Sequence, residues 1–277
     1  MNQLLNQRSW RFIDQSISAM DKTPLESFAM DDTLCHLVGQ GMSHPTIRTW
    51  VHDKTVVLGI QDHRLPYVLE GISLLEKRGY HSIVRNSGGL AVVLDSGVLN
   101  ISLVLPEKDH AISINDGYEA KVDLIKYLFP EVASEIKAYE IVGSYCPGSY
   151  DLSIEGRKFA GISQRRIRQG IAVQIYLCIE GSGSERAELI RDFYQISLKG
   201  EKTKFIYPEI KPSVMASLSE LLNKEMTVFE TVANLQKFML SNGDMNLQNL
   251  NEKETEYYAF YLNRVFERNK KMLLPNQ

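Results

Sequence analysis

The sequence predicts an α+β fold, in which a mixed, largely antiparallel sheet is flanked by helices and followed by a helical C-terminal segment. Several stretches repeat apolar residues at helical spacing, and strand-like runs with turn residues lie between them. Beyond Pro212 we find helical patterns in series. Because no repeat or low-complexity linker interrupts the chain, we expect one main domain over residues 1–210 and a helical extension over 211–277 that packs on it.

Helices are expected where a capping signal precedes an amphipathic stretch. Thr23, Pro24 and Glu26 form a capping-box pattern that begins a helix over 24–38. The other predicted helices cover 66–77, 116–129, 184–194, 214–222, 228–240 and 252–272.

Strands are expected over 46–52, 55–59, 81–85, 91–94, 98–105, 136–142 and 150–154. We place a hairpin turn at Asp53–Lys54, between the first two of these strands. The clearest hairpin joins 158–168 to 171–179 through Gln169–Gly170. Every odd position from Ile171 to Ile179 is apolar, so one face of that strand should lie in the core.

Composition limits the class of protein. The chain has 277 residues, 44% hydrophobic and 23% charged, which is typical of a globular protein and excludes disorder. A formal net charge of −3 argues against a nucleic-acid binder, and no apolar run approaches the ~20 residues needed to span a bilayer. The three cysteines are far apart and the N-terminus has no secretory signal, so we expect a soluble cytoplasmic protein.

The first place that could carry chemistry is the turn from Arg85 to Ala91. Its paired glycines, Gly88 and Gly89, let the backbone approach a ligand, and Arg85 could supply a charge for a carbonyl or a phosphate. An ordinary β-turn is the alternative interpretation. The turn lacks the lysine and the following helix of a P-loop, so it does not support ATP binding.

The second place is Cys146, at the tip of a connection with glycine and proline on both sides. Such a loop exposes a thiol as a nucleophile requires, although a thiol without a role is the alternative. Lys158 follows a short hairpin that can fold back towards Cys146, where it could bind a substrate carbonyl or move a proton. No Cys–His pair can be identified, and no spacing of Cys, His, Asp or Glu predicts a metal site.

The third place is a basic strand. Residues 156–179 contain five cations and no acid, and two interpretations of this pattern stay open. The strand docks an acidic protein partner, or it is a solvated face that protects a sheet edge. The cations are Arg157, Lys158, Arg165, Arg166 and Arg168.

Six segments resemble the biotin/lipoate protein ligase and octanoyltransferase superfamily. They are Ser27–Leu34, Thr55–Gln61, the turn Arg85–Ala91, Asp95–Asn100, Gly143–Ser153 and Gly156–Arg166. The last two are the most specific and are similar to the cysteine-dependent branch, which relays octanoyl or lipoyl groups between proteins. The resemblance covers roughly residues 25–195 and implies the catalytic fold of these ligases.

The resemblance also implies an activity in protein lipoylation. An octanoyl or lipoyl group would pass from a lysine of the glycine cleavage H protein to a lipoyl-domain lysine of a 2-oxo acid dehydrogenase subunit. Cys146 would carry the group as a thioester, and Lys158 would contact the acyl carbonyl. Val92, Val93 and Leu99 are candidate neighbours of an apolar tunnel. The residues expected to bind substrate are Arg85, Ser87, Gly88, Gly89, Ala91, Gly161 and Ile162.

Three departures from the ligase pattern concern the cofactor. Ligase members carry a second arginine and a third glycine in the turn, where this chain has Val84 and Leu90, and Leu94 replaces a common histidine. A thioester route needs no adenylate, so we expect neither ATP nor another cofactor, and no nucleic-acid or membrane partner. The alternatives are an octanoyl-acyl carrier protein transferase, an ATP-dependent lipoate ligase and a non-catalytic acyl-protein-binding module.

Overall fold

The computed structural model describes residues 2–108 and 111–273, and two β-sheets form its centre. The strands are β1 (Ser9–Gln15), β2 (Thr46–Trp50), β3 (Thr55–Leu58), β4 (His81–Val84), β5 (Val92–Leu94), β6 (Val98–Pro106), β7 (Lys137–Ala138), β8 (Leu152–Ile154), β9 (Arg157–Ile167), β10 (Gly170–Cys178) and β11 (Asp244–Leu247). The larger sheet has the order β11-β1-β2-β6-β10-β9-β8-β7, and the smaller has the order β4-β3-β5. In the larger sheet β1 runs parallel to β2 and β11, and the other pairs are antiparallel.

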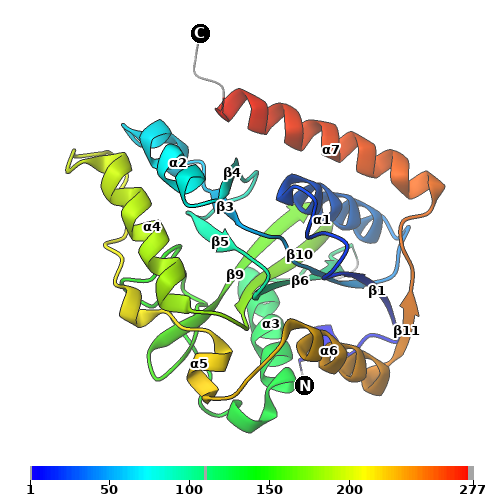
Figure 1. Cartoon of the computed structure of the whole chain (residues 1–277). Helices are drawn as coiled ribbons and strands as arrows, with labels where there is room; N and C mark the ends of the chain where they lie inside the picture. The colour runs from blue at the N-terminus through cyan, green and yellow to red at the C-terminus, as the bar shows by residue number, and fades with distance from the viewer. Residues whose placement is uncertain (1, 109–110, 274–277) are drawn as a thin grey trace.

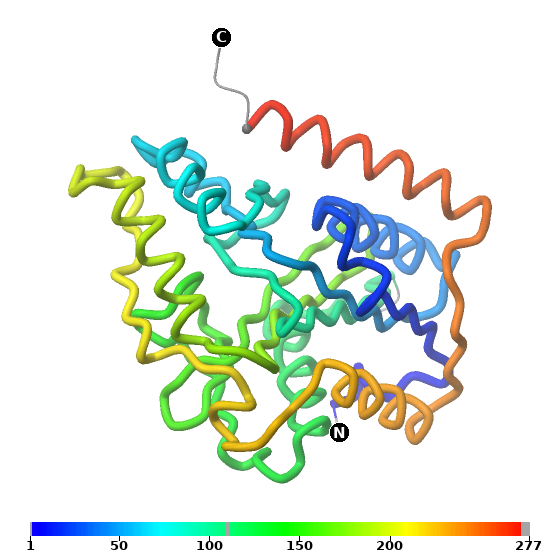
Figure 2. Tube along the Cα trace, viewed as in Figure 1, coloured from blue at the N-terminus to red at the C-terminus, as the bar shows by residue number. Residues whose placement is uncertain are grey.

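Helices cover both faces of the larger sheet and pack on the smaller one (Figure 1). They are α1 (Pro24–Gly39), α2 (Val68–Lys77), α3 (Ile114–Leu128), α4 (Gly183–Leu198), α5 (Leu218–Leu222), α6 (Val228–Asn242) and α7 (Glu252–Leu273). The helices α3 and α6 close the main core on one face, and α1 lies on the other with α7 alongside it (Figure 2). The predicted mixed, largely antiparallel sheet flanked by helices is confirmed.

A buried polar cluster fixes α1 to the larger sheet. Asp31 of α1 accepts hydrogen bonds from Arg48 of β2 at 2.6 Å and from Ser102 of β6 at 2.8 Å. Arg48 also donates to Ser27, one turn earlier on α1, at 2.7 Å. Each of these buried polar groups has a partner, so the cluster can hold α1 in one orientation above the sheet.

The predicted hairpin is confirmed, but its turn is one residue earlier than expected. Gly170 pairs with Ile167, so Arg168 and Gln169 form the turn, and both adopt positive φ. Gly170 instead allows close packing, since a Cβ there would lie 1.9 Å from the carbonyl oxygen of Cys35 in α1.

The predicted hairpin at Asp53–Lys54 is wrong. The strand β2 belongs to the larger sheet and β3 to the smaller one, so this connection crosses between sheets. Both edges of β2 are occupied by β1 and β6, and β3 therefore pairs with β4 and β5.

Two predicted elements are shorter than expected, because their backbone has other partners. The strand expected over 136–142 stops at Ala138, and the N–H of Ile141 turns towards the carboxylate of Asp151. The helix expected over 214–222 is reduced to α5, because Met215 and Ala216 are extended alongside Lys158. The N–H of Ala216 donates to the carbonyl of Lys158 at 2.9 Å.

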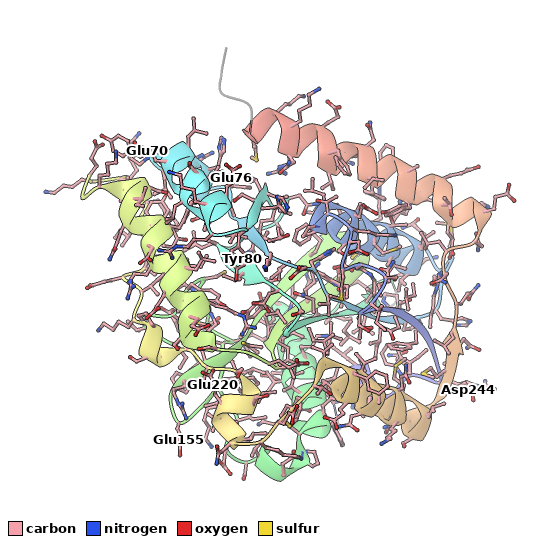
Figure 3. All side chains as sticks on the ribbon, in the orientation of Figure 1. Glu70, Glu76, Tyr80, Glu155, Glu220 and Asp244 are labelled. Carbon is pink, nitrogen blue, oxygen red and sulfur yellow. The ribbon has the colours of Figure 1, made fainter. Side chains whose placement is uncertain are left out.

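The first and last parts of the chain meet in the larger sheet, at strands that the sequence analysis missed. The short, mostly exposed strand β11 pairs with β1, and its Asp244 is labelled at the right of Figure 3. Arg11 of β1 lies buried and binds Glu254 of α7 at 2.7 Å. The division at residue 210 stays a prediction, but β11 and α7 are packed on the elements that precede it.

Among residues 2–108 and 111–273, no helix is both long and apolar enough to cross a bilayer.

Replacing Glu254 by alanine should lower the free energy of unfolding by about 3 kcal/mol, because the buried Arg11 loses its counter-ion. Urea denaturation measures the change. The control is Glu256→Ala, an exposed acid on the same helix, which should alter the free energy by less than about 0.5 kcal/mol. Equal losses in the two variants would contradict this role for the ion pair.

Candidate functional site

A cavity of about 330 Å³ lies where the smaller sheet meets the larger one. Its walls come from α1, α3, the central strands of the larger sheet, β3 and β5, and two loops that carry the sequence-predicted site residues. The residues from these loops and from β9 include Arg85, Ser87, Gly88, Gly89, Cys146, Lys158, Gly161 and Ile162. The residues that the sequence analysis selected from these two loops and from β9 therefore lie around one cavity.

Cys146 lies half-buried on the loop between β7 and β8, and its backbone adopts a φ of +45°. This left-handed conformation is uncommon for a residue with a side chain and needs support from its surroundings. The sulfur accepts a hydrogen bond from the N–H of Leu90 at 3.2 Å. The loop therefore directs the thiol into the cavity and against the glycine turn.

Lys158 of β9 supplies the support for that loop. Its Nζ donates to the carbonyls of Tyr145 and Cys146, at 2.9 Å each. It also forms an ion pair with Asp151 at 2.9 Å, and both side chains are only 2% exposed. Burial raises the pKa of Asp151, while the neighbouring Lys158 opposes that shift.

The second oxygen of Asp151 extends this support to the rest of the loop. Its Oδ2 accepts from the N–H of Gly148 at 3.2 Å and from the N–H of Ile141 at 3.4 Å. Asp151 thus binds the base of the loop and Lys158 binds its tip. Sequence reasoning missed Asp151, although it lies within the most specific stretch of the chain.

The glycine turn packs directly against the thiol. Gly89 has a φ of +110°, and a Cβ there would lie 2.7 Å from Nη1 of Arg85 and 3.3 Å from the sulfur of Cys146. Glycine at this position is therefore required for the close approach of arginine and thiol. Arg85 is buried and donates to the carbonyls of Gly88 and Leu90.

One donor of Arg85 has no partner. Among the described residues, no group accepts a hydrogen bond from its buried Nε, although other parts of the residue line the cavity. A buried donor without a partner is costly to the fold.

Behind the turn lies Asp62, which sequence reasoning also missed. Its carboxylate accepts from the N–H of Gly59 at 2.6 Å and from the hydroxyl of Tyr194 at 2.8 Å. Burial raises the pKa of Asp62 to about 6, and the charge of Arg85 opposes that shift. Since a Cβ on Gly59 would lie 2.0 Å from the carbonyl oxygen of Gly89, this cluster supports the turn from below.

One part of the cavity wall is an apolar recess, while the wall elsewhere carries polar side chains, namely Asn100, Ser163, Gln164 and Gln174. Of the three expected tunnel neighbours, Val92 lines it, whereas Val93 and Leu99 lie in the surrounding core. The remaining apolar wall comes from residues that the sequence analysis did not select: Phe28, Trp50, Val57, Leu94 and Ile175. Strand periodicity marks such positions as buried but gives no sign that they face a cavity.

One expected substrate-binding residue, Ala91, lies behind the turn. It is fully buried in the core of the smaller sheet and is absent from the cavity lining among the described residues. Its position favours a packing role, and its contact with substrate stays a prediction.

The basic strand does not present its arginines as one surface. Arg165 and Arg166 are adjacent on β9 and point to opposite faces, where they pair with Asp32 and Glu107. Arg157 lies at the other end of the strand beside Glu155, which Figure 3 labels at the lower left. Arg168 lies in the β9–β10 turn. A docking role for these four residues stays a prediction.

The other two thiols differ from Cys146. Cys35 and Cys178 are fully buried, and burial raises the pKa of each, to about 11 for Cys178. No histidine in the described part of the chain lines the cavity. The site combines a nucleophile, a buried cation, an unpaired guanidinium donor and an apolar recess. These are the groups that acyl transfer requires.

The chain matches a protein-family model. The model is that of the lipoyl protein ligase A/B catalytic domain, and it matches residues 23–239.

Curated relatives match almost the whole chain. A protein of Lysinibacillus sphaericus named octanoyl-[GcvH]:protein N-octanoyltransferase is 67% identical over 274 residues, which is 99% of each chain. A protein of Listeria monocytogenes named lipoyl-[GcvH]:protein N-lipoyltransferase is 50% identical over 273 residues, or 98% of each chain.

Solved structures share the fold. A lipoate-protein ligase A bound with ATP has a TM-score of 0.67 at 16% identity, with 92% of this chain and 95% of that one covered. A bipartite lipoate protein ligase of Thermoplasma acidophilum has a TM-score of 0.66 at 15% identity, with 98% of each chain covered. At such identities the likeness concerns the fold alone.

The ion pair of Asp151 and Lys158 can be tested by a double-mutant cycle. Asp151→Asn and Lys158→Met should each lower the free energy of unfolding by about 3 kcal/mol, because each leaves a buried group without its partner. The double variant should lose less than the sum, as measured by urea denaturation. The exposed pair of Lys199 and Glu70, changed to methionine and glutamine, should show a coupling below about 1 kcal/mol. Strict additivity at Asp151 and Lys158 would contradict the assigned coupling.

The raised pKa of Asp62 predicts a pH dependence. The folded protein holds the proton more tightly than the unfolded chain, whose ordinary value is 3.8. The stabilisation from this group is complete below about pH 4 and is lost as the pH rises through about 6. Asparagine does not titrate, so the stability of Asp62→Asn relative to wild type should improve by about 2 kcal/mol from pH 4 to pH 8. A difference that stays constant with pH in urea denaturation would rule out this titration.

Proposed function

The chain belongs to the lipoyl protein ligase A/B catalytic domain family, and we propose that it moves an octanoyl group between proteins through a thioester on Cys146. The names of two relatives include octanoyl-[GcvH], and on that support we take the octanoyl-lysine of the glycine cleavage H protein as the donor. The acceptor is a lipoyl-domain lysine of a 2-oxo acid dehydrogenase subunit. The chain is thus an N-acyltransferase of protein lipoylation.

The observation that carries the mechanism is the position of the Cys146 sulfur. It lies at the cavity that contains the apolar recess, 3.2 Å from the N–H of Leu90. Lys158 binds the carbonyl of the same cysteine. An acyl group whose chain fills the recess would therefore place its carbonyl carbon beside the thiol and its oxygen beside N–H donors.

In the first step the sulfur attacks the amide carbonyl of the donor. A carbon–sulfur bond forms, the carbon–nitrogen bond breaks, and the thiol proton ends on the departing lysine amine. Negative charge develops on the carbonyl oxygen during the attack. The unpaired Nε of Arg85, the charge of Lys158 and the N–H of Leu90 are the groups that support its stabilisation.

In the second step an acceptor lysine attacks the thioester. Its amine forms the new amide, the carbon–sulfur bond breaks, and a proton from the amine returns to the thiol. One lysine amide is exchanged for another, so the sequence of steps needs no energy from nucleotide hydrolysis. We therefore propose that neither ATP nor another cofactor takes part.

The apolar recess supports an alkyl chain as the substrate. A cavity of about 330 Å³ is at the small end of the range for small-molecule sites. At about 0.8 kcal/mol per methylene, burial of the six methylenes of an octanoyl chain would contribute ~5 kcal/mol. Trp50 and Phe28, which meet edge to face, lie in the wall of this recess.

We place the reaction in the cytoplasm. The three cysteines are free thiols in the structure, and a nucleophilic thiol is preserved in a reducing compartment.

Intact-mass measurement tests the donor and the nucleophile together. Incubation with octanoylated H protein should add one octanoyl group to the wild-type chain and none to Cys146→Ser. The matched control Cys35→Ser changes a buried thiol outside the cavity and should still acquire the adduct.

The same measurement separates the alternatives. Adduct from octanoyl-acyl carrier protein instead of the H protein would identify the carrier-dependent transferase. Adduct that requires octanoate and ATP would indicate a ligase-type activation. A chain that binds the H protein and forms no adduct with any donor would be a binding module, and the thioester mechanism would be wrong.

A further inference from the structure

A second hollow adjoins the catalytic cavity on its outer side. It has a volume of about 670 Å³ and lies between the glycine turn, the loop before Cys146 and the segment after α4. Four residues line both this groove and the cavity, namely Ser87, Gly88, Gly89 and Pro147. The groove therefore begins at the rim of the site.

The groove carries apolar side chains that the fold leaves exposed. Val142, in the loop before Cys146, is 77% exposed, and Ile206, in the segment after α4, is 91% exposed. Phe205 lies beside Ile206 and is partly exposed. Large apolar residues gathered on two walls of one groove indicate a contact surface more strongly than single exposed residues do.

Hydrogen bonds hold both walls in place without substrate. The hydroxyl of Tyr207 donates to the carbonyl of Gln61 at 2.6 Å, which ties the segment with Ile206 to the end of β3. The N–H of Lys211 donates to the carbonyl of Gly143 at 2.8 Å, which joins that segment to the loop with Val142. The apolar walls are thus part of the framework that also carries Cys146.

A rival surface lies elsewhere along β9. A hollow between α1, α7 and the end of β9 is lined by Arg165, Arg168 and Arg264 together with aromatic residues of α7. Among the described residues it shares none of its lining with the catalytic cavity. Because Asp32 neutralises Arg165, the positive charge of this hollow is also smaller than the sequence suggests.

We propose that the groove with Val142 and Ile206 is the docking surface for the folded domain that presents the acylated lysine. This inference rests on the proposed function, because only a protein substrate needs such a surface. A lysine amine is four methylenes from its backbone, so the domain surface must come close to the thiol. A groove that begins at the cavity rim meets this requirement.

The chemistry of the groove specifies the kind of partner. Its charged lining is balanced, with Arg64 and Lys211 opposed by Glu140 and Glu209. Electrostatic attraction of a strongly acidic face is therefore not its main feature. The occupant is a folded domain whose surface around the modified lysine is apolar and carries little net charge.

Two donors separate docking from chemistry. Octanoylated H protein must dock, whereas a small octanoyl thioester such as octanoyl-N-acetylcysteamine reaches Cys146 without docking. In the double variant Val142→Asp/Ile206→Asp, the apparent KM for the H protein should rise at least tenfold. The rate of acylation by the small thioester should stay within twofold of wild type.

Matched variants define the outcomes. Ile17→Asp changes an apolar residue of similar exposure, 76%, on another part of the surface and should leave both donors unaffected. Arg168→Glu/Arg264→Glu tests the rival hollow. An unchanged KM in the groove variant, or a rise confined to the arginine variant, would overturn the proposal.

Binding keeps the test independent of the thioester. The Kd of octanoylated H protein for Cys146→Ser should rise at least tenfold when the two aspartates are added. If wild type forms no adduct with either donor but this Kd still rises, the proposed chemistry fails and the docking surface stands. If the Kd is unchanged, the docking surface fails whatever the chemistry.

Discussion

The buried ion pair between Asp151 and Lys158 is the interaction on which the site depends. Lys158 belongs to β9, whose register is fixed by β8 and β10, so the larger sheet sets the position of its amine. The amine holds the tip of the cysteine loop, and Asp151 holds its base. Two charges taken out of water are costly unless each is paired and further hydrogen-bonded, and here both conditions are met by the loop itself. The left-handed conformation of Cys146 persists because this framework fixes both neighbouring carbonyls.

The same arrangement links substrate binding to the loop. An ammonium group has three protons, and Asp151 and the carbonyls of Tyr145 and Cys146 engage all three. An acyl carbonyl that approaches Lys158 must therefore share or replace one of these acceptors. Replacement of the Cys146 carbonyl would move the residue that carries the nucleophile. Arg85 differs, since its buried Nε makes no hydrogen bond to a described residue.

Much of the fold and of the site was predictable, for identifiable reasons. The hairpin of β9 and β10 follows from period-two alternation, and α1 follows from its capping residues. Cys146 and Lys158 stand out because loop glycines and a short hairpin constrain where they lie. Asp151 and Asp62 did not stand out in the sequence. Asp62 matters because it is buried against Tyr194, which is distant in the chain, and Asp151 matters because it binds backbone N–H groups. The strand β11 has only four residues and three of them are exposed, so its short polar–apolar alternation marks no buried face. Gly170 appeared to be a turn residue, whereas its contact with α1 arises from the tertiary fold.

The pairing of β1 with β11 has a consequence for biosynthesis. The strand β1 is made long before β11, which is one of its two neighbours in the sheet. That edge of β1 can therefore be paired only when residues 244–247 have been made. Until then one edge of β1 stays open, and an open edge is a template for pairing with other chains. Arg11 likewise gains its counter-ion only after residue 254 has been made. A growing chain that has not reached this residue therefore carries both an open sheet edge and an unpaired arginine, and each favours contacts with other chains.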